Sequence, residues 1–294
     1  MTKRNLALIG ATIVSLIYGL TFSIAKDVMP QYIAPFGFIV LRVLGATLLF
    51  WIVSIFSPKE KIATADFLRI TAAAFFGVAF NMLTFFKGLS YTSPIMSAVL
   101  MVTSPILVLI FSAIMVKEKL ETKKVIGIVL GLSGAAVLIL YGKSLNSMPH
   151  AMLGNFLVFI NAVSYAFYLI IVKKLMDKYN AFTFVKWIYT LGFFMVLPFG
   201  WNEIQQVEWH SIPTDIYYKI GFVVLFSTFF TYLLNLLSMR ELSPTTVAVF
   251  IYLQPLFATL FAIGMGTDHL DAVKIGSAFF VFFGVYLVIR KKIK

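Results

Sequence analysis

The chain has 294 residues, of which 61% are hydrophobic and 12% charged, and it contains no cysteine. Soluble domains average about 45–50% apolar and about 25% charged residues, so a soluble core of this size could not bury so much apolar surface. The lack of cysteine excludes disulfides and thiolate metal sites. The net charge is +12, but the basic residues form short clusters between apolar runs without a basic stripe, so we expect no nucleic-acid partner.

Ten apolar runs are long enough to cross a bilayer, which requires about 20 residues in a helix. In chain order they cover residues 6–25, 33–56, 67–88, 93–115, 123–141, 152–172, 180–200, 216–238, 243–265 and 271–290. The first run follows Lys3 and Arg4 as a signal peptide would, but it is too long for one, so we expect a mature helix. The longest connection, 201–215, carries two Trp and a Pro, typical of an interfacial loop. The sequence therefore predicts an all-α integral membrane protein with ten transmembrane helices.

Lysine and arginine are distributed unevenly over the two sides of these helices. With the N-terminus inside, 16 of the 24 basic residues lie at inside ends and 5 at outside ends, while Arg42, Arg69 and Lys186 fall within spans. Loops rich in Lys and Arg stay in the cytoplasm. We therefore expect a multi-pass protein of a bacterial-type plasma (inner) membrane, with both termini cytoplasmic. This bias also accounts for the net charge without an anionic macromolecule.

The chain repeats itself. A shift of 150 residues places Ser93–Pro94 on Ser243–Pro244 and Pro105 on Pro255, and a shift of 147 places Tyr18 on Tyr165. The same second shift continues through Lys26 on Lys173 and Gly45 on Gly192. Each half, 1–145 and 146–294, holds five spans, and because five is odd the second half starts on the opposite side. The repeats are therefore inverted, an arrangement typical of secondary transporters with a substrate site between the halves.

Four prolines mark these repeats. Pro94 and Pro244 open their helices, where a missing N–H costs nothing, and Ser93 and Ser243 precede them as N-caps. Pro105 and Pro255 lie in mid-helix, where each frees a backbone carbonyl. In lipid that carbonyl must be satisfied by protein or by water in a cavity. Because the kinks recur in both halves, we expect the four prolines to border a central pathway as hinges; the alternative is a purely structural kink.

Both halves resemble the EamA domain of the drug/metabolite transporter superfamily. The resemblance lies in "GLSYTSPIMSAVLMVTSPILVLIFSAIMVKEKLETKKVIGIVLGLSGAAVLI" (88–139), its echo "RELSPTTVAVFIYLQPLFATLFAIGMGTDHLDAVKIGSAFFVFFGVYLV" (240–288) and "PFGFIVLRVLGATLLF" (35–50). It covers nearly the whole chain. The second half departs from the pattern where "KEKL" (117–120) becomes "TDHL" (267–270). The resemblance implies a cavity between the halves and export or exchange of small metabolites, amino acids or drugs.

Polar side chains inside spans are costly, so they are candidates for function. Asn161, Tyr165 and Tyr168 share one helix face, and Thr228, Thr231 and Asn235 share another. Arg42 cannot lose its proton, so it must face water, a carbonyl or an anionic substrate. The predicted substrate contacts are Tyr18, Arg42, Asn81, Asn161, Tyr165, Tyr168, Asn235 and Gln254. The alternative is that these groups join helices by hydrogen bonds.

Absent groups narrow the function further. All twelve Asp and Glu lie at helix ends or in loops, and no metalloprotease motif, nucleophile–base set or glycine-rich phosphate loop is present. We therefore expect no enzyme activity, no cofactor and no metal, but an alternating-access transporter that works as a facilitator driven by the substrate gradient. A membrane-embedded enzyme or a non-transporting scaffold stays open. Gly127 and Gly131 form a GxxxG motif that would suit close helix packing, including against a second copy of the chain.

Overall fold

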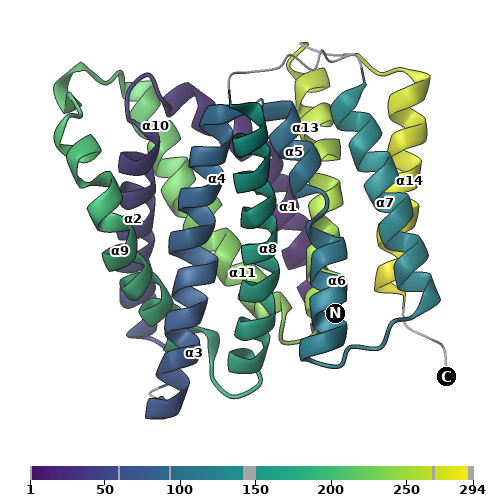
Figure 1. The fold of residues 1–294 in the computed structure, drawn as a ribbon, viewed down its shortest axis with the longest axis horizontal. Coiled ribbons are helices and arrows are strands. Elements are labelled where there is room, and N and C mark those ends of the chain that lie inside the picture. The colour runs from purple at the N-terminus through teal and green to yellow at the C-terminus, as the bar shows by residue number, and fades with distance from the viewer. Residues whose placement is uncertain (1, 59, 93, 142–149, 267–268, 291–294) are drawn as a thin grey trace.

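The computed structural model describes residues 2–58, 60–92, 94–141, 150–266 and 269–290, and every regular element within them is a helix (Figure 1). Ten helical spans in this part of the chain are long and apolar enough to cross a membrane. The predicted all-α fold with ten transmembrane helices is thus confirmed. The proposed boundary between halves, at residues 145 and 146, lies outside the described residues.

Six of the spans are single helices. They are α1 (Lys3–Val28), α2 (Pro35–Ser54), α7 (Thr122–Leu140), α8 (Ala151–Met176), α9 (Ala181–Gln205) and α14 (Ala272–Ile289). Because α9 runs to Gln205, the predicted loop 201–215 is shorter than expected, and it contains the 3-10 turn Trp209–Ser211. On the last turns of this helix, Glu203 accepts a hydrogen bond from the Gly37 N–H of α2.

Four spans are interrupted, and the interruptions recur in the repeat register. The third span is α3 (Thr64–Ala74), a π-helical segment η1 (Phe75–Ala79) and α4 (Phe80–Tyr91); the eighth is α10 (Thr214–Phe222), a π-helical segment η3 (Val223–Phe230) and α11 (Thr231–Ser238). The fourth is α5 (Pro94–Met101) and α6 (Ser104–Met115); the ninth is α12 (Pro244–Val249), the 3-10 segment η4 (Phe250–Tyr252) and α13 (Leu253–Gly264). The two halves therefore share local backbone irregularities as well as sequence.

Hydroxyl groups satisfy the carbonyls near the two inner prolines. Pro105 cannot bond the carbonyl of Met101, and the Ser104 hydroxyl donates to that oxygen at 2.7 Å. In the ninth span, the Ser15 hydroxyl of α1 donates at 2.8 Å to the carbonyl of Phe250, five residues before Pro255. Ser243 caps α12 by accepting from the Thr246 N–H at 3.3 Å, whereas Ser93 lies outside the described residues. Hydroxyl groups of the protein therefore bond backbone carbonyls close to both breaks.

Packing between spans follows the inverted repeat. The helix α2 packs on α9, and α7 packs on α14, while α1 lies against α11 and α13 in the way that α8 lies against α4 and α6. Figure 1 shows spans that follow one another in the chain running in opposite directions, with α1 starting on the side where α14 ends. We call this side the basic face. It holds the helix ends at Lys3, Ser54, Thr64, Met115, Thr122, Met176, Ala181, Ser238, Pro244 and Ile289.

Glycines allow α7 and α14 to approach closely. A Cβ atom at position 284 would lie 2.5 Å from the Gly127 carbonyl oxygen and 2.6 Å from the Gly131 nitrogen, and one at position 134 would lie 2.6 Å from the Ser277 carbonyl oxygen. Gly284 corresponds to Gly134 under the 150-residue shift. The GxxxG motif therefore packs within the chain, which removes the reason to assign it to a second copy. Large apolar side chains such as Phe56, Met152 and Phe279 are exposed, as expected of helices that face lipid.

Candidate functional site

Six side chains from five spans meet between the two halves. We call them the central cluster: Tyr18 of α1, Arg42 of α2, Tyr165 and Tyr168 of α8, Tyr189 of α9 and Tyr232 of α11. The ring centroids of Tyr189 and Tyr232 lie 5.2 Å apart, and those of Tyr168 and Tyr232 lie 6.0 Å apart. Tyr18 and Tyr165 lie near each other and near Tyr232. Half of the predicted substrate contacts are thus brought into one place.

The π-helical segment η1 fixes two of the tyrosines. The Tyr232 hydroxyl donates to the Gly77 carbonyl at 2.8 Å, and the Tyr168 ring packs on the Cα of Gly77, where any Cβ would collide with it. A π-helical turn disrupts the regular α-helical hydrogen-bond ladder. Glycine and the π turn together let α8 and α11 place their aromatic rings against the third span.

Arg42 is the only ionisable group of the cluster that carries a charge at neutral pH. It is 7% exposed, and its Nε donates to the Thr228 hydroxyl at 3.1 Å. That hydroxyl in turn donates to the Val223 carbonyl at 2.8 Å within η3. The guanidinium carbon lies 6.0 Å and 5.8 Å from the ring centroids of Phe38 and Phe86. Tyr18, Tyr189 and Tyr232 are close enough to interact with it electrostatically.

Two hydroxyls of the cluster have no partner in the described part of the chain. They belong to Tyr168, which is 3% exposed, and Tyr189, which is fully buried. Buried polar atoms in folded proteins are almost always hydrogen-bonded, and exceptions point to strain, function or an additional molecule. The cluster therefore combines one buried cation with hydroxyl groups that are able to bind something further.

The predicted asparagines lie elsewhere. The Asn81 amide donates to the Asn161 backbone carbonyl at 3.3 Å, and the Asn161 amide donates to the Asn81 carbonyl at 2.7 Å. This reciprocal pair joins α4 to α8 in the way expected of helix-joining polar groups, although Oδ1 of Asn161 is buried without a partner among the described residues. The hydrogen bonds of the described residues include none from the side chains of Asn235, which is buried, or Gln254, which is half-buried.

Tyr189 and Tyr232 were missed at the sequence level, although signals for both were present. The 147-residue shift that places Tyr18 on Tyr165 also places Arg42 on Tyr189. Tyr232 follows Thr228 by four residues and therefore shares its helix face. The central cluster thus contains two pairs of equivalent positions, one of which holds Tyr in both halves and one of which holds Arg and Tyr.

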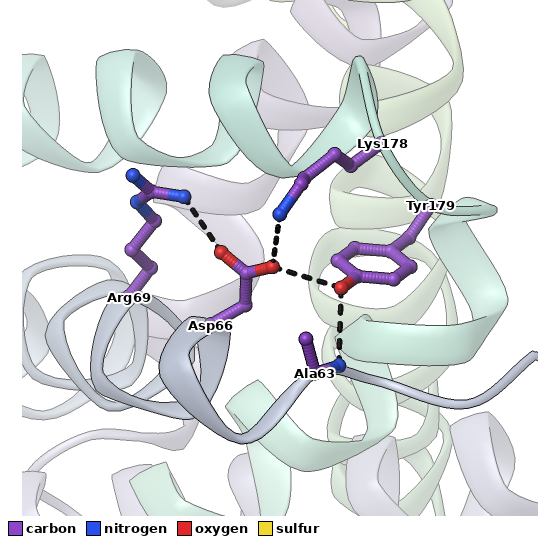
Figure 2. Close-up of polar contacts among 5 residues, drawn as sticks. All are labelled: Ala63, Asp66, Arg69, Lys178 and Tyr179. Atoms are coloured by element: carbon purple, nitrogen blue, oxygen red, sulfur yellow. Dashed lines mark hydrogen bonds and ion pairs between the residues drawn. The ribbon is translucent and has the colours of Figure 1, made fainter.

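Polar contacts join the two halves at the basic face. Asp66, in the first turn of α3, is 2% exposed at its side chain and accepts from Lys178 at 2.5 Å, from the Tyr179 hydroxyl at 2.8 Å and from Arg69 at 2.6 Å (Figure 2). Tyr179 also accepts from the Ala63 N–H at 3.1 Å. A carboxylate in the first turn of a helix is stabilised by the helix dipole. This cluster fastens the start of the third span to the loop after α8.

A second carboxylate also joins the two halves at the basic face. Glu118, after α6, accepts from Lys124 at 2.8 Å and, across the repeat boundary, from the Ser243 and Thr245 hydroxyls at 2.7 and 2.9 Å. Ser243 and Thr245 begin the ninth span. The first half is therefore fastened to the second half at two separated points of this face.

The α2–α9 pair is fastened at both ends by glutamates. At the opposite face, Glu203 of α9 accepts from the Gly37 N–H at the start of α2 at 2.7 Å. At the basic face, Glu60, which follows α2, accepts from the Asn180 N–H and the Thr183 hydroxyl at the start of α9 at 2.8 and 2.7 Å. An anion at a helix N-terminus is favoured by the free N–H groups and the dipole. The opposite face also carries an ion pair of Lys219 with Asp27 at 2.8 Å.

Two pockets open at the basic face, away from the central cluster. One of about 330 Å³ lies between the end of α2 and the start of α9 and includes Lys186 and Glu60. The Lys186 ammonium lies 4.6 Å from the Trp51 ring, as expected of a snorkelling lysine beside an interfacial tryptophan. The other, of about 230 Å³, includes Arg4, Lys124 and Glu241.

Comparison with known proteins places this geometry in a family context. The EamA-like transporter family matches residues 5–140 and 152–290. A protein of Archaeoglobus fulgidus named as an uncharacterized transporter is 27% identical over 276 residues, covering 94% of this chain and 95% of its own. The uncharacterized transporter YetK of Bacillus subtilis is 25% identical over 257 residues, covering 87% and 77%. A protein of known crystal structure superposes with a TM-score of 0.79 over 97% of this chain and 96% of its own at 14% identity, a likeness of fold alone.

Proposed function

This chain belongs to the EamA-like transporter family, and we propose that it is a secondary transporter that moves small metabolites, amino acids or drug-like molecules by alternating access. The observation that carries the proposal is the central cluster. Two pairs of residues in equivalent positions of the inverted halves, Tyr18 with Tyr165 and Arg42 with Tyr189, meet between those halves. A substrate site at the interface of inverted repeats is what alternating access requires. We place the boundary between the halves at residues 145 and 146.

The transport cycle opens one face while the other stays closed. Opening the basic face separates Lys178 and Tyr179 from Asp66 and releases Ser243 from Glu118. Opening the other face separates Lys219 from Asp27. Each of these contacts is a short polar interaction at a helix end that water can replace, so breaking it costs less than unpacking an apolar interface. The proline breaks of the fourth and ninth spans serve as hinges.

The basic face lies in the cytoplasm of a bacterial-type plasma membrane in this proposal, and the direction is export. The support for this orientation is the uneven distribution of Lys and Arg between the two sides. Reporter fusions test the orientation: a reporter in residues 177–180 is expected inside, and one in 206–213 outside. Both reporters on one side would contradict the orientation and the inverted repeat together.

Transport runs down the gradient of the substrate itself. The central cluster holds tyrosines and an arginine, which do not exchange protons near neutral pH. Two acids that could border the pathway, Asp27 and Glu241, are at the faces, where Asp27 pairs with Lys219 and Glu241 is exposed. A facilitator therefore fits this chain better than an obligatory proton antiporter.

The experiment that tests the function is solute release from proteoliposomes. Vesicles that contain the purified protein are loaded with a water-soluble extract of bacterial cells, and release is followed by mass spectrometry beside protein-free vesicles. We expect release of at least one solute at a rate that saturates with its concentration. Release that is equal in both vesicle types would contradict the proposal and favour a scaffold. The purified protein in detergent, before it is placed in vesicles, shows whether the transporter is a monomer or a homodimer.

A further inference from the structure

The charge of Arg42 has no counter-charge among the described residues. Its guanidinium is 7% exposed, and no Asp or Glu of the described residues forms an ion pair with it. The acids that close the two faces, such as Asp66 and Glu203, are occupied by other donors. A buried charge is costly unless it is paired and hydrogen-bonded. Something other than a carboxylate of this part of the chain must therefore compensate Arg42 during function.

Most of the hydrogen-bonding capacity of Arg42 is also unused. A guanidinium has five N–H donors, and only the Nε–H is bonded, to Thr228 at 3.1 Å. The Phe38 and Phe86 rings lie 6.0 and 5.8 Å from the guanidinium carbon, at the outer limit of a cation–π contact. The two terminal nitrogens, which form the planar fork that matches a carboxylate, thus remain available.

The neighbours of Arg42 are suited to a small organic acid. The Tyr189 hydroxyl is buried without a partner among the described residues and lies near Arg42, so it is able to donate to the same oxyanion. Tyr232 is already bonded, to the Gly77 carbonyl, and offers its ring. The cluster supplies one positive charge, which neutralises one negative charge and not two.

We propose that the transported solute carries a single carboxylate, as in a monocarboxylic or amino acid, and that the free fork of Arg42 with the Tyr189 hydroxyl binds it between the tyrosine rings. This proposal rests on the proposed transport function. Arg42 then acts as the anchor that holds the acid group while the two halves rearrange around the rest of the solute. If Arg42 instead only joins α2 to η3 through Thr228, Thr228→Val should reduce release as much as Arg42→Gln.

The test uses the extract-loaded proteoliposomes with four variants. Every solute whose release depends on the protein is expected to carry one carboxylate, and its own amide, loaded in parallel, is expected to be retained. Arg42→Gln should slow release about tenfold to a hundredfold, because it removes the charge and the fork. Arg42→Lys, which keeps the charge, should retain more release than Arg42→Gln. Thr228→Val and the matched control Lys186→Gln should leave the acid-over-amide preference unchanged.

The possible failures are distinguishable. Release of solutes without an acid group, or of amides as fast as acids, overturns the carboxylate anchor and leaves the transport function standing. The same holds if Arg42→Gln releases acids at the wild-type rate, or if Thr228→Val loses as much release as Arg42→Gln, which marks Arg42 as a joint. If Arg42→Gln does not reach the membrane, release by Arg42→Lys and by Thr228→Val distinguishes a carboxylate anchor from a residue that only joins helices. Release of nothing from the extract overturns the transport function itself, and the anchor with it.

Discussion

Tyr18 and Tyr165 occupy equivalent positions in the two halves, and so do Arg42 and Tyr189, yet only the second pair differs in charge. Around them the backbone is nearly a copy: η1 and η3 interrupt the third and eighth spans, and Gly134 and Gly284 approach the partner helix in the same way. A symmetric frame allows either face to open, since the same movement is available to both halves. An asymmetric centre gives a bound molecule one orientation. Substitutions can therefore change either the symmetric frame or the asymmetric centre.

The largest effect is expected from adding a side chain at the glycine contacts between α7 and α14. Gly284→Val would place a Cβ within 2.6 Å of the backbone of α7, and backbone cannot move aside as a side chain can. We expect a loss of about 3 kcal/mol or more, at or above the usual range for overpacking, seen as lower membrane abundance and a lower melting temperature. Gly134→Val should do the same. The control is Gly276→Ala on the same helix, where nothing lies within 4 Å; equal losses for Gly276 and Gly284 would contradict the packing account.

The second effect concerns the asymmetric centre. Tyr189→Phe removes one neutral hydroxyl from the position that corresponds to Arg42. A neutral hydrogen bond contributes about 0.5–1.5 kcal/mol, so we expect solute release to slow by about two- to tenfold, less than in Arg42→Gln. The measurement is the initial rate of release at equal protein abundance. A Tyr189→Phe defect as severe as that of Arg42→Gln would show that the two halves contribute equally after all.

The third effect concerns the closure of the basic face. Asp66→Asn removes the acceptor charge for Lys178 and Arg69 (Figure 2), so the face should open more often. Because the natural chain has no cysteine, a single Ala181→Cys, at a buried position of α9, reports opening by its maleimide labelling rate. We expect Asp66→Asn to raise that rate about threefold. Asp177→Asn, which affects an exposed ion pair with Lys173, is the matched control and should leave the labelling rate unchanged.

No effect at all is expected from a pH gradient. At a fixed membrane potential, a pH difference across the proteoliposome membrane should leave the final distribution of the solute at equilibrium, because no group of the central cluster exchanges a proton near neutral pH. The measurement is the ratio of solute inside to outside after release has stopped. Accumulation above equilibrium that depends on the pH gradient would refute the facilitator, and its loss in Asp27→Asn or Glu241→Gln would identify the acid responsible.

Length and apolarity predicted the spans well, because the cost of burying polar backbone in lipid leaves few alternatives to a helix. The inverted repeat followed from the Ser-Pro pairs. The π-helical segments did not, since Phe75–Ala79 has the composition of any apolar helix and its irregular backbone serves Tyr168 and Tyr232, which are distant in sequence. Polarity alone could not separate Asn81 and Asn161, which join helices, from the tyrosines that meet at the centre. The contact of Asp66 with Lys178 spans 112 residues, between the first turn of α3 and the loop after α8, and leaves no sequence pattern.

The central claim is that the two faces open in alternation around the central cluster, and paired spin-label distances test it most directly. One cysteine pair, at Thr64 and Asp177, reports the basic face, and another, at Gln31 and Asn202, reports the opposite face; all four side chains are exposed, and the two residues of each pair belong to different halves. In lipid nanodiscs with a transported acid, we expect two distances for each pair. Conditions that lengthen the distance within one pair should shorten the distance within the other. A single unchanged distance at both faces, or lengthening of both together, would contradict alternating access.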